Sequence, residues 1–510
     1  MASKKLFFNF NMIIRDIKMH WPIWLMGMLG YTFTCTAVIA LGFPRYELTH
    51  DYDIAYSVVQ SLTETTHLFS ICMGLAVALA SFGYLTKKRK HYFYESLPFN
   101  RLSLFATRYL FGVITIAIPV VSLYIIELIQ TTFYGYFAIW ELTQWMIISL
   151  AEYLFWYSLG VFVVILCGRY GMACFCYIAV SVAWMLFEVL LDAYSQLLYV
   201  GVKSGLGLFE FTSYNILSPI EFFTEIETRA SYDLDGSAYF YQEGTFVKVL
   251  IALIAVVVLT VVAYLLYERR KSEKTDDNFV FPAVRVVFNW CFALYSALGF
   301  GLFFIALFIS AGEGQAHIMS HRAGILVILL ILGFTGYMSS CMIAEKKFRV
   351  FGQNMVKCCI FLGVLALLMI GMFHDVFKIE KYVPDKEDCK EATIIGEYSP
   401  DGKYKNYHTY NKAGVNKTVE LLQLVIDNFD DVCGEYSYDT YFEDTKRLQI
   451  HIEMDKGNIR RMYYVTEGSN LDKKLKEFMK ENIRLFTDRN SGYYEYEDAY
   501  EHEVYYDYYD

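Results

Sequence analysis

Long apolar blocks recur along the first three quarters of the chain, each about as long as a helix needs to cross a bilayer. Nine blocks stand out, at residues 21–43, 67–85, 102–128, 143–168, 172–195, 247–267, 291–311, 323–344 and 358–373. They are continuously apolar and do not alternate with a period of two, so the pattern predicts transmembrane helices and not barrel strands. Because the block at 358–373 is short, eight spans are the alternative to nine.

Lysine and arginine are distributed unevenly between the two sets of connecting segments. With the N-terminus inside, the inner segments carry 19 of these residues and the outer loops carry 4. Positive residues accumulate on the cytoplasmic side of membrane proteins. The bias therefore predicts an N-terminus inside the cell and, with nine spans, a region outside the cell from about residue 374 onward.

The first 20 residues mix apolar side chains with Lys4, Lys5, Arg15 and Lys18. This pattern is typical of an amphipathic helix in the headgroup plane and not of a removable signal peptide. We expect residues 1–20 to form a cytoplasmic interfacial helix that positions the first span.

The region from residue 374 to the end has a different composition. It contains 19 Lys and Arg against 30 Asp and Glu, a net charge of −11, so the rest of the chain sums to about +1 and the overall −10 belongs to this region. Its patterns predict a helix from Val415 to Asp430, strands at Arg447–Glu453 and Ile459–Val465, and a helix from Leu471 to Phe486. We expect a small extracellular α+β domain.

The last residues, from Gly492, are Tyr, Glu and Asp in near repetition. Such a segment has no aliphatic face to bury, so we expect an acidic, flexible tail. An acidic region does not suit nucleic acid, and we expect no nucleic-acid partner.

Overall composition agrees with a membrane location. Hydrophobic residues make up 56% of the chain and charged residues 19%, with a mean hydropathy of +0.32. A water-soluble fold cannot bury so much apolar surface. The expected fold class is an all-α polytopic membrane bundle of about nine helices, N-terminus inside, with the α+β domain at its C-terminal end.

Catalytic motifs are absent from the sequence. It contains no phosphate-binding G-x-x-x-x-G-K-[ST] loop, no H-E-x-x-H and no G-x-S-x-G. His317 and His321 lie four apart in a predicted outer loop, without a further ligand at matching spacing beyond Glu313. We expect no enzyme activity, no metal and no cofactor bound by this chain itself.

Acidic residues inside the predicted spans are candidates for a substrate pathway, because charges are costly in lipid. Glu152 lies near the middle of the fourth block, and Glu188 and Asp192 lie four apart on one face of the fifth. Arg108 and Glu127 lie near opposite ends of the third block. A structural ion pair or an interfacial position is the alternative for each.

Nine of the eleven cysteines lie in or beside predicted spans, where they behave as small apolar residues. Cys389 and Cys433 are the two exceptions. A disulfide between them is one prediction for an oxidising compartment, and two reduced thiols are the other.

The segment Lys87–Arg101, between the second and third blocks, combines a basic run, aromatic residues and a proline. These features predict a short interfacial helix on the inner side that another protein can bind. Its end, Ser96-Leu97-Pro98-Phe99-Asn100-Arg101, resembles the S-L-P-x-[ST]-R loop of type-2 ABC transporter permeases. Asn100 stands where that family has Ser or Thr.

Two further motifs are similar to those of the same family. Tyr267 to Glu273 resembles the Y-x-x-R-x-x-E segment that ends a span in permeases of Gram-positive ABC operons, and Leu217 to Phe223 resembles an L-S-P-x-x-x-F segment before the last span. The resemblance covers residues 1–275. The remainder resembles a longer subgroup with extra spans and an extracellular domain that follows a Y-x-P linker, here Tyr382-Val383-Pro384.

The resemblance implies a division into a permease core at 21–275, further spans at 276–373, an outer domain at 374–491 and a tail at 492–510. It implies a cell-membrane location, a second permease subunit of the same or another chain, and a cytoplasmic ABC ATPase dimer that binds ATP and Mg²⁺. The residues that it assigns to ATPase coupling are Tyr92, Phe93, Tyr94, Glu95, Leu97, Pro98 and Arg101. The implied substrate is an amphiphilic, envelope-active compound such as an antimicrobial peptide or a lipid-linked molecule.

Other functions remain open from sequence. A membrane-anchored sensor would bind a signal with its outer domain and relay it to a cytoplasmic partner. An ion-coupled transporter that used Glu152 and Glu188 would be expected to show an internal repeat, and the sequence shows none.

Overall fold

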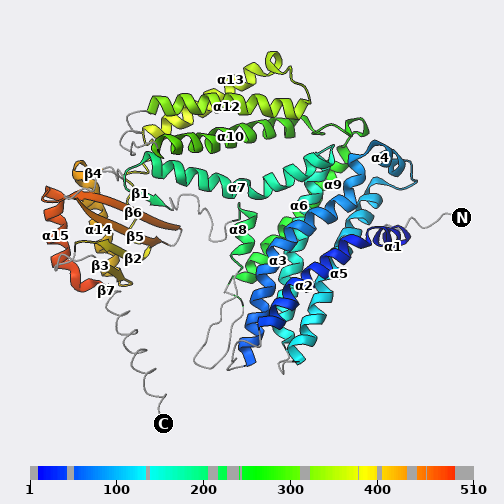
Figure 1. Cartoon of the computed structure of the whole chain (residues 1–510), viewed down its shortest axis with the longest axis horizontal. Helices are drawn as coiled ribbons and strands as arrows, with labels where there is room; N and C mark the ends of the chain where they lie inside the picture. Colours follow the sequence, from blue (N-terminus) through cyan, green and yellow to red (C-terminus); the bar gives the residue numbers. More distant parts are fainter. Residues whose placement is uncertain are drawn as a thin grey trace, which may run out of the picture. The chain divides into compact units, whose positions relative to one another are not determined.

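The computed structural model describes residues 10–42, 51–133, 138–204, 216–226, 241, 244–310, 322–376, 378–398, 405–433, 445–454 and 457–488. Within these ranges a long helix lies at each predicted apolar block (Figure 1). The helices are α2 (Trp21–Gly42), α3 (Asp51–Phe82), α5 (Arg101–Phe133), α6 (Ile139–Leu166), α7 (Tyr170–Leu198), α9 (Thr245–Arg269), α10 (Pro282–Ser310), α12 (Arg322–Glu345) and α13 (Phe351–Phe373).

Eight of these helices are long and apolar enough to cross a membrane, counted over the described residues alone, with mean hydropathies from 1.7 to 3.1. They include α13, the short block at 358–373. The remaining helix, α2, has side chains outside the described residues, so a ninth span and the orientation stay predictions. Large apolar side chains such as Phe300, Ile331 and Leu367 remain exposed on the helices. A lipid environment explains such surfaces, and the chain is a polytopic helical membrane protein.

The chain divides into two compact units. The first comprises the described residues within Met1–Met185, Tyr214–Phe288 and Ile343–Lys347. The second comprises those within Leu186–Ser213, Asn289–Met342 and Phe348–Asp510. The first unit thus holds most of the predicted permease core, while the second half of α7 belongs with α10, α12, α13 and the C-terminal domain.

Close packing of α3 against α6 forms the centre of the first unit. Gly74 of α3 lies against the backbone of Trp156, and Gly160 of α6 lies against Ala78. Small residues at a helix interface allow the two backbones to approach closely, which favours association in lipid.

Replacement of Gly74 by alanine is expected to destabilise the first unit by about 1–3 kcal/mol. A Cβ at this position would lie 2.7 Å from the Cβ of Trp156 and 2.8 Å from its carbonyl carbon. The matched control is Gly363→Ala in α13, where nothing lies within 4 Å and the gain in helix propensity is expected to stabilise by about 0.5–1 kcal/mol. Thermal unfolding of both variants in detergent measures the effect, and equal midpoints would contradict it.

The C-terminal domain is an antiparallel sheet with two helices packed on it. The order is β1-β6-β5-β2-β3-β7, and β4 (Val432–Cys433) pairs with β6 beyond this path. The strands of the path are β1 (Val202–Ser204), β6 (Gly457–Thr466), β5 (Thr445–Met454), β2 (Cys389–Gly396), β3 (Lys405–Thr409) and β7 (Thr487–Asp488). The helices are α14 (Lys412–Asp427) and α15 (Asn470–Asn482).

The predicted helices and the predicted hairpin of this domain are confirmed. Alternating burial along β5 and β6 places Ile450, Ile452 and Tyr463 in a core shared with α14. Capping side chains set the helix starts: Asn411 accepts a hydrogen bond from the amide of Ala413, and Ser469 accepts one from Asp472. The predicted tail lies outside the described residues, as do His317 and His321.

The edge strand β1 was not predicted from the sequence. It follows α7 directly and pairs with β6, with Val202 opposite Arg461. Gly201 makes the turn into this strand with φ +79°, and a side chain there would meet the ring of Tyr463. The loop after α7 is therefore part of the C-terminal sheet.

The C-terminal domain is expected to lose stability as the pH falls below neutrality. Burial, together with the nearby Arg460 guanidinium, lowers the pKa of His451 below its ordinary value of 6.5. The unfolded chain then binds this proton more readily, so the contribution to stability is full above about pH 6.5 and declines as the pH falls through that value. Amide hydrogen exchange of β5 and β6 at pH 7.5 and 5.5 in the full chain measures it. The His451→Gln variant should show a flatter dependence, and an identical dependence would contradict the assignment.

Candidate functional site

The segment Lys87–Arg101 forms a short helix, as predicted, and then an extended turn. The helix is α4 (Lys88–Glu95), which follows the 3-10 turn η2 (Gly83–Thr86) at the end of α3. Ser96 ends it, and its hydroxyl donates to the carbonyl of Phe93. Pro98 disfavours a helical conformation at the preceding residue, so the chain turns before α5 begins at Arg101.

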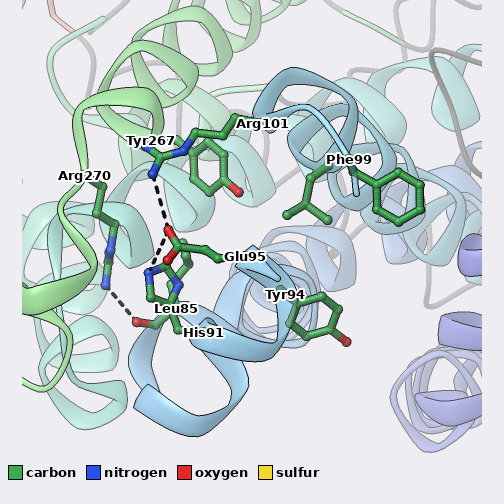
Figure 2. A pocket seen from close by; sticks show the side chains of 9 residues that line it. Leu85, His91, Tyr94, Glu95, Phe99, Arg101, Tyr267 and Arg270 are labelled. Carbon is green, nitrogen blue, oxygen red and sulfur yellow. Dashed lines mark hydrogen bonds and ion pairs between the residues drawn. The ribbon is translucent and has the colours of Figure 1, made fainter. Parts of the chain in front are cut away.

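The C-terminal end of α4 is anchored to the start of α5 and to the chain at the end of α9, and Figure 2 shows the contact between Glu95 and Arg101. Arg101 donates from Nη2 to Glu95 Oε1 at 3.3 Å and from Nη1 to the carbonyl of Glu268 at 2.7 Å. The second carboxylate oxygen of Glu95 accepts a hydrogen bond from the Ser272 hydroxyl at 2.6 Å. The last turn of α4 is therefore tied to the start of α5 and to the end of α9.

Arg270, just beyond α9, joins further helix ends beneath α4. Its Nη1 donates to the carbonyls of Ile165 at 2.5 Å and Cys167 at 3.0 Å, and its Nη2 donates to that of Leu85 at 2.9 Å. Burial lowers the pKa of Arg270 to about 10, which leaves it protonated at neutral pH. A cation at helix C-termini is favourable because the carbonyl dipoles point toward it.

A cavity of about 330 Å³ lies between these residues (Figure 2). His91 of α4 lines it, with Nε2 3.4 Å from Glu95 Oε1. Burial lowers the pKa of His91, so the ring is neutral at neutral pH. Figure 2 shows Glu95, Arg101 and Arg270 lining the same space.

The predicted coupling residues fall into two groups. Tyr92 and Phe93 are each 54% exposed, and Pro98 is exposed beside them. Tyr94 instead packs inward, its ring 4.7 Å from that of Tyr84 and 4.4 Å from the Arg108 guanidinium carbon. Together with Glu95 and Arg101, Tyr94 holds α4 in place, while the exposed aromatic residues are available to a partner. Leu97 is half-buried.

Arg108 forms a buried ion pair behind α4, the structural alternative given for it from the sequence, but its partner was not predicted. Arg108 of α5 lies 2.8 Å from Asp16 of α1 (Phe10–Met19), and both side chains are buried. Burial raises the pKa of the Asp16 carboxyl, and the nearby Arg108 guanidinium opposes that rise. Asp16 is the only acidic residue among the first 20, and this isolation was the available signal. The pair fastens the N-terminal helix to the bundle.

The predicted pathway residues belong to different units of the chain. Glu152 is buried in the first unit, where it contacts His67 and Ser70 of α3. Glu188 and Asp192 belong to the second unit, and Asp192 accepts a hydrogen bond from Gln196 one turn later in α7. The His67 partner of Glu152 was not predicted, because nothing local relates residues so far apart in the chain.

The suggested disulfide between Cys389 and Cys433 is not supported. Cys389 lies in β2 opposite Met454, and Cys433 lies in β4 opposite Tyr464, with β5 and β6 between the two strands. Neighbouring strands lie about 4.8 Å apart, whereas a disulfide needs Cα atoms within about 7 Å. The thiol of Cys389 is free and donates to the carbonyl of Asp385.

No protein-family model, no curated protein and no solved structure matches this chain. The fold defines a multi-pass helical membrane protein with a small sheet domain near its C-terminus.

Proposed function

We propose that this chain is the permease subunit of an ATP-binding cassette transporter, with α4 as the docking element for a separate ATPase. The exposure of Tyr92 and Phe93 on a helix that is anchored to the start of α5 and to the chain at the end of α9 carries the proposal. Interface anchors are typically aromatic side chains held by a rigid scaffold. A force applied to α4 reaches Arg101, at the start of α5, through Glu95, and Arg101 passes it to the end of α9 at Glu268.

The anchoring network gives the proposal its mechanism. ATP-driven closure of a cytoplasmic ATPase dimer would displace α4, and the linked helix ends would move with it. Two such subunits, identical or different, would then rock between inward and outward packings, a shift between two states driven by ligand binding. This chain supplies the path and the coupling, while the ATPase binds ATP and Mg²⁺.

The proposed cargo is an amphiphilic, envelope-active compound such as an antimicrobial peptide or a lipid-linked molecule. The bundle is set in the cell membrane, α4 faces the cytoplasm and the C-terminal domain lies outside the cell. An acidic external domain attracts cationic compounds by long-range electrostatics, which weakens with salt.

Purification from native membranes in mild detergent tests the proposal. We expect an ATPase subunit to copurify and its ATP turnover to depend on the presence of this chain. Labelling of single cysteines placed in the Lys87–Arg101 segment should react only with reagents that enter the cytoplasm. A complete native assembly without an ATPase would contradict the permease function and favour the sensor.

A further inference from the structure

A second cavity lies in the first unit, far along α3 from α4. It has a volume of about 590 Å³, and its lining residues are Gln60, Thr63, Glu64, His67, Leu68, Ile71, Thr224 and Ile226. The last two come from the end of α8 (Pro219–Thr224) and the residues after it. The rise along α3 and η2 places this cavity about 30 Å from α4.

The buried carboxylate of Glu152 lies next to a residue that lines this cavity. Glu152 of α6 is 1% exposed, and its carboxylate accepts a hydrogen bond from the Ser70 hydroxyl at 2.6 Å. The Nδ1 atom of His67, which lines the cavity, lies 3.1 Å from the other oxygen of Glu152. A carboxylate is costly within a membrane bundle and usually serves a bound group or a pathway. The imidazole of His67 connects this carboxylate to the cavity.

The charges around the cavity are unbalanced. Glu64 lies on its wall, and none of its described lining residues is a lysine or an arginine. On the elements that face it, the Lys248 ammonium lies 3.0 Å from the Glu225 carboxylate and is neutralised there. Glu64 therefore gives the cavity wall a carboxylate that no lysine or arginine among the described lining residues neutralises.

Apolar and polar groups are both available on the wall. Leu68 is 67% exposed, and Ile71 and Ile226 lie beside it, while Gln60 and Thr63 offer hydrogen-bonding groups. An apolar surface next to a negative group matches a molecule with an alkyl chain and a cationic head.

We propose that this cavity binds the ammonium group of a cationic amphiphile. The ammonium lies between Glu64 and the His67–Glu152 pair, and the alkyl chain follows Leu68 and Ile71. This inference names the substrate class of the transporter and rests on the proposed function for transport, but the binding step requires no partner.

Binding of dodecylammonium to the full chain in phosphatidylcholine nanodiscs tests the site. Calorimetry against empty nanodiscs gives the affinity, and dodecanol serves as the uncharged probe of equal length. We expect dodecylammonium to bind at least tenfold more tightly than dodecanol. The Glu152→Gln variant should lose at least tenfold in affinity for dodecylammonium. Glu127→Gln, at a buried acid of α5 that does not line the cavity, should keep the wild-type affinity.

A second variant tests the same site in case Glu152→Gln does not fold. Glu64 is exposed, so Glu64→Gln is expected to fold normally and to weaken dodecylammonium binding about threefold or more. Unchanged affinity in this variant and in a folded Glu152→Gln chain, or equal binding of dodecanol, would overturn the proposal.

Nanodiscs that contain phosphatidylethanolamine distinguish a lipid from a free amphiphile. If the amine headgroup of this lipid occupies the cavity, the lipid will compete with dodecylammonium and weaken its binding to the wild-type chain. In the Glu152→Gln variant, the lipid will then weaken dodecylammonium binding less. If the ligand is a free amphiphile, the lipid will have no effect, and the site stands in either case.

The binding assay contains no ATPase and no nucleotide. Its result therefore tests the ammonium site independently of the proposed permease function. Absence of a copurifying ATPase would contradict the proposed permease function but would not affect the proposal that this cavity binds an ammonium group. Unchanged dodecylammonium binding in the variants would contradict the proposed binding site but would not affect the proposed docking of an ATPase at α4.

Discussion

Replacement of both Tyr92 and Phe93 by serine is expected to abolish association of the ATPase and ATP-dependent transport, with binding weakened at least about 100-fold. Aromatic side chains at the centre of an interface commonly contribute about 2 kcal/mol or more each, and a factor of ten corresponds to about 1.4 kcal/mol. Both rings are 54% exposed, so their removal costs the fold little packing. Copurification of the ATPase and transport in proteoliposomes measure the effect.

A matched control separates docking from a general loss of surface aromatic residues. Phe348, between α12 and α13, is 87% exposed, and the charge distribution predicts that its loop is also cytoplasmic. Its replacement by serine should leave ATPase association unchanged. The thermal unfolding midpoint of the double variant should match that of the wild-type chain. Undiminished ATPase binding by the Tyr92→Ser, Phe93→Ser chain would exclude α4 as the docking element.

Loss of the Arg108 side chain is expected to destabilise the first unit by about 3–5 kcal/mol. The Arg108→Met variant leaves the Asp16 carboxyl without its buried cation and with only the exposed Arg15 nearby, and removal of one member of a buried pair is strongly destabilising. Tyr94 also loses the guanidinium against its ring, so α4 becomes less well held. The variant should therefore lose both stability and ATPase binding.

A double-mutant cycle tests the pair directly. Asp16→Asn and Arg108→Met, alone and together, should show an interaction free energy above about 1 kcal/mol in thermal or urea unfolding. The control is Arg15→Gln, whose side chain is 58% exposed and 3.7 Å from Asp16, and it should change stability by less than about 1 kcal/mol. Strictly additive effects of the first two substitutions would show that the pair contributes nothing of its own.

In the proposed transporter, the ATPase and the ligand bind at two different regions of the first unit, α4 and the second cavity. The partner would act at α4, through Glu95, Arg101 and Arg270. The ligand would bind at the opposite part of α3, beside His67 and Glu152. A long, closely packed helix pair, α3 with α6, extends between the two regions, so a change in their packing would affect both.

Much of the architecture was predictable from local patterns. The positions of the long helices followed from continuous apolar runs, because lipid requires each span to satisfy its own backbone. The hairpin of β5 and β6 followed from alternation around a short turn, and α14 from a helical period of Val415, Val419 and Leu422. The short helix α4 followed from the composition of Lys87–Arg101. Each of these features depends on residues that are near one another in the chain.

Other features were decided only by the tertiary structure. No local pattern pairs β1 with β6, places His67 beside Glu152, or places Arg108 against Asp16 and Tyr94. The suggested disulfide was wrong for the same reason, since the spacing of Cys389 and Cys433 says nothing of the strands that lie between them. Hydropathy determines which segments enter the membrane. Partners far apart in the chain are selected by packing, because that is what brings their side chains within reach of one another.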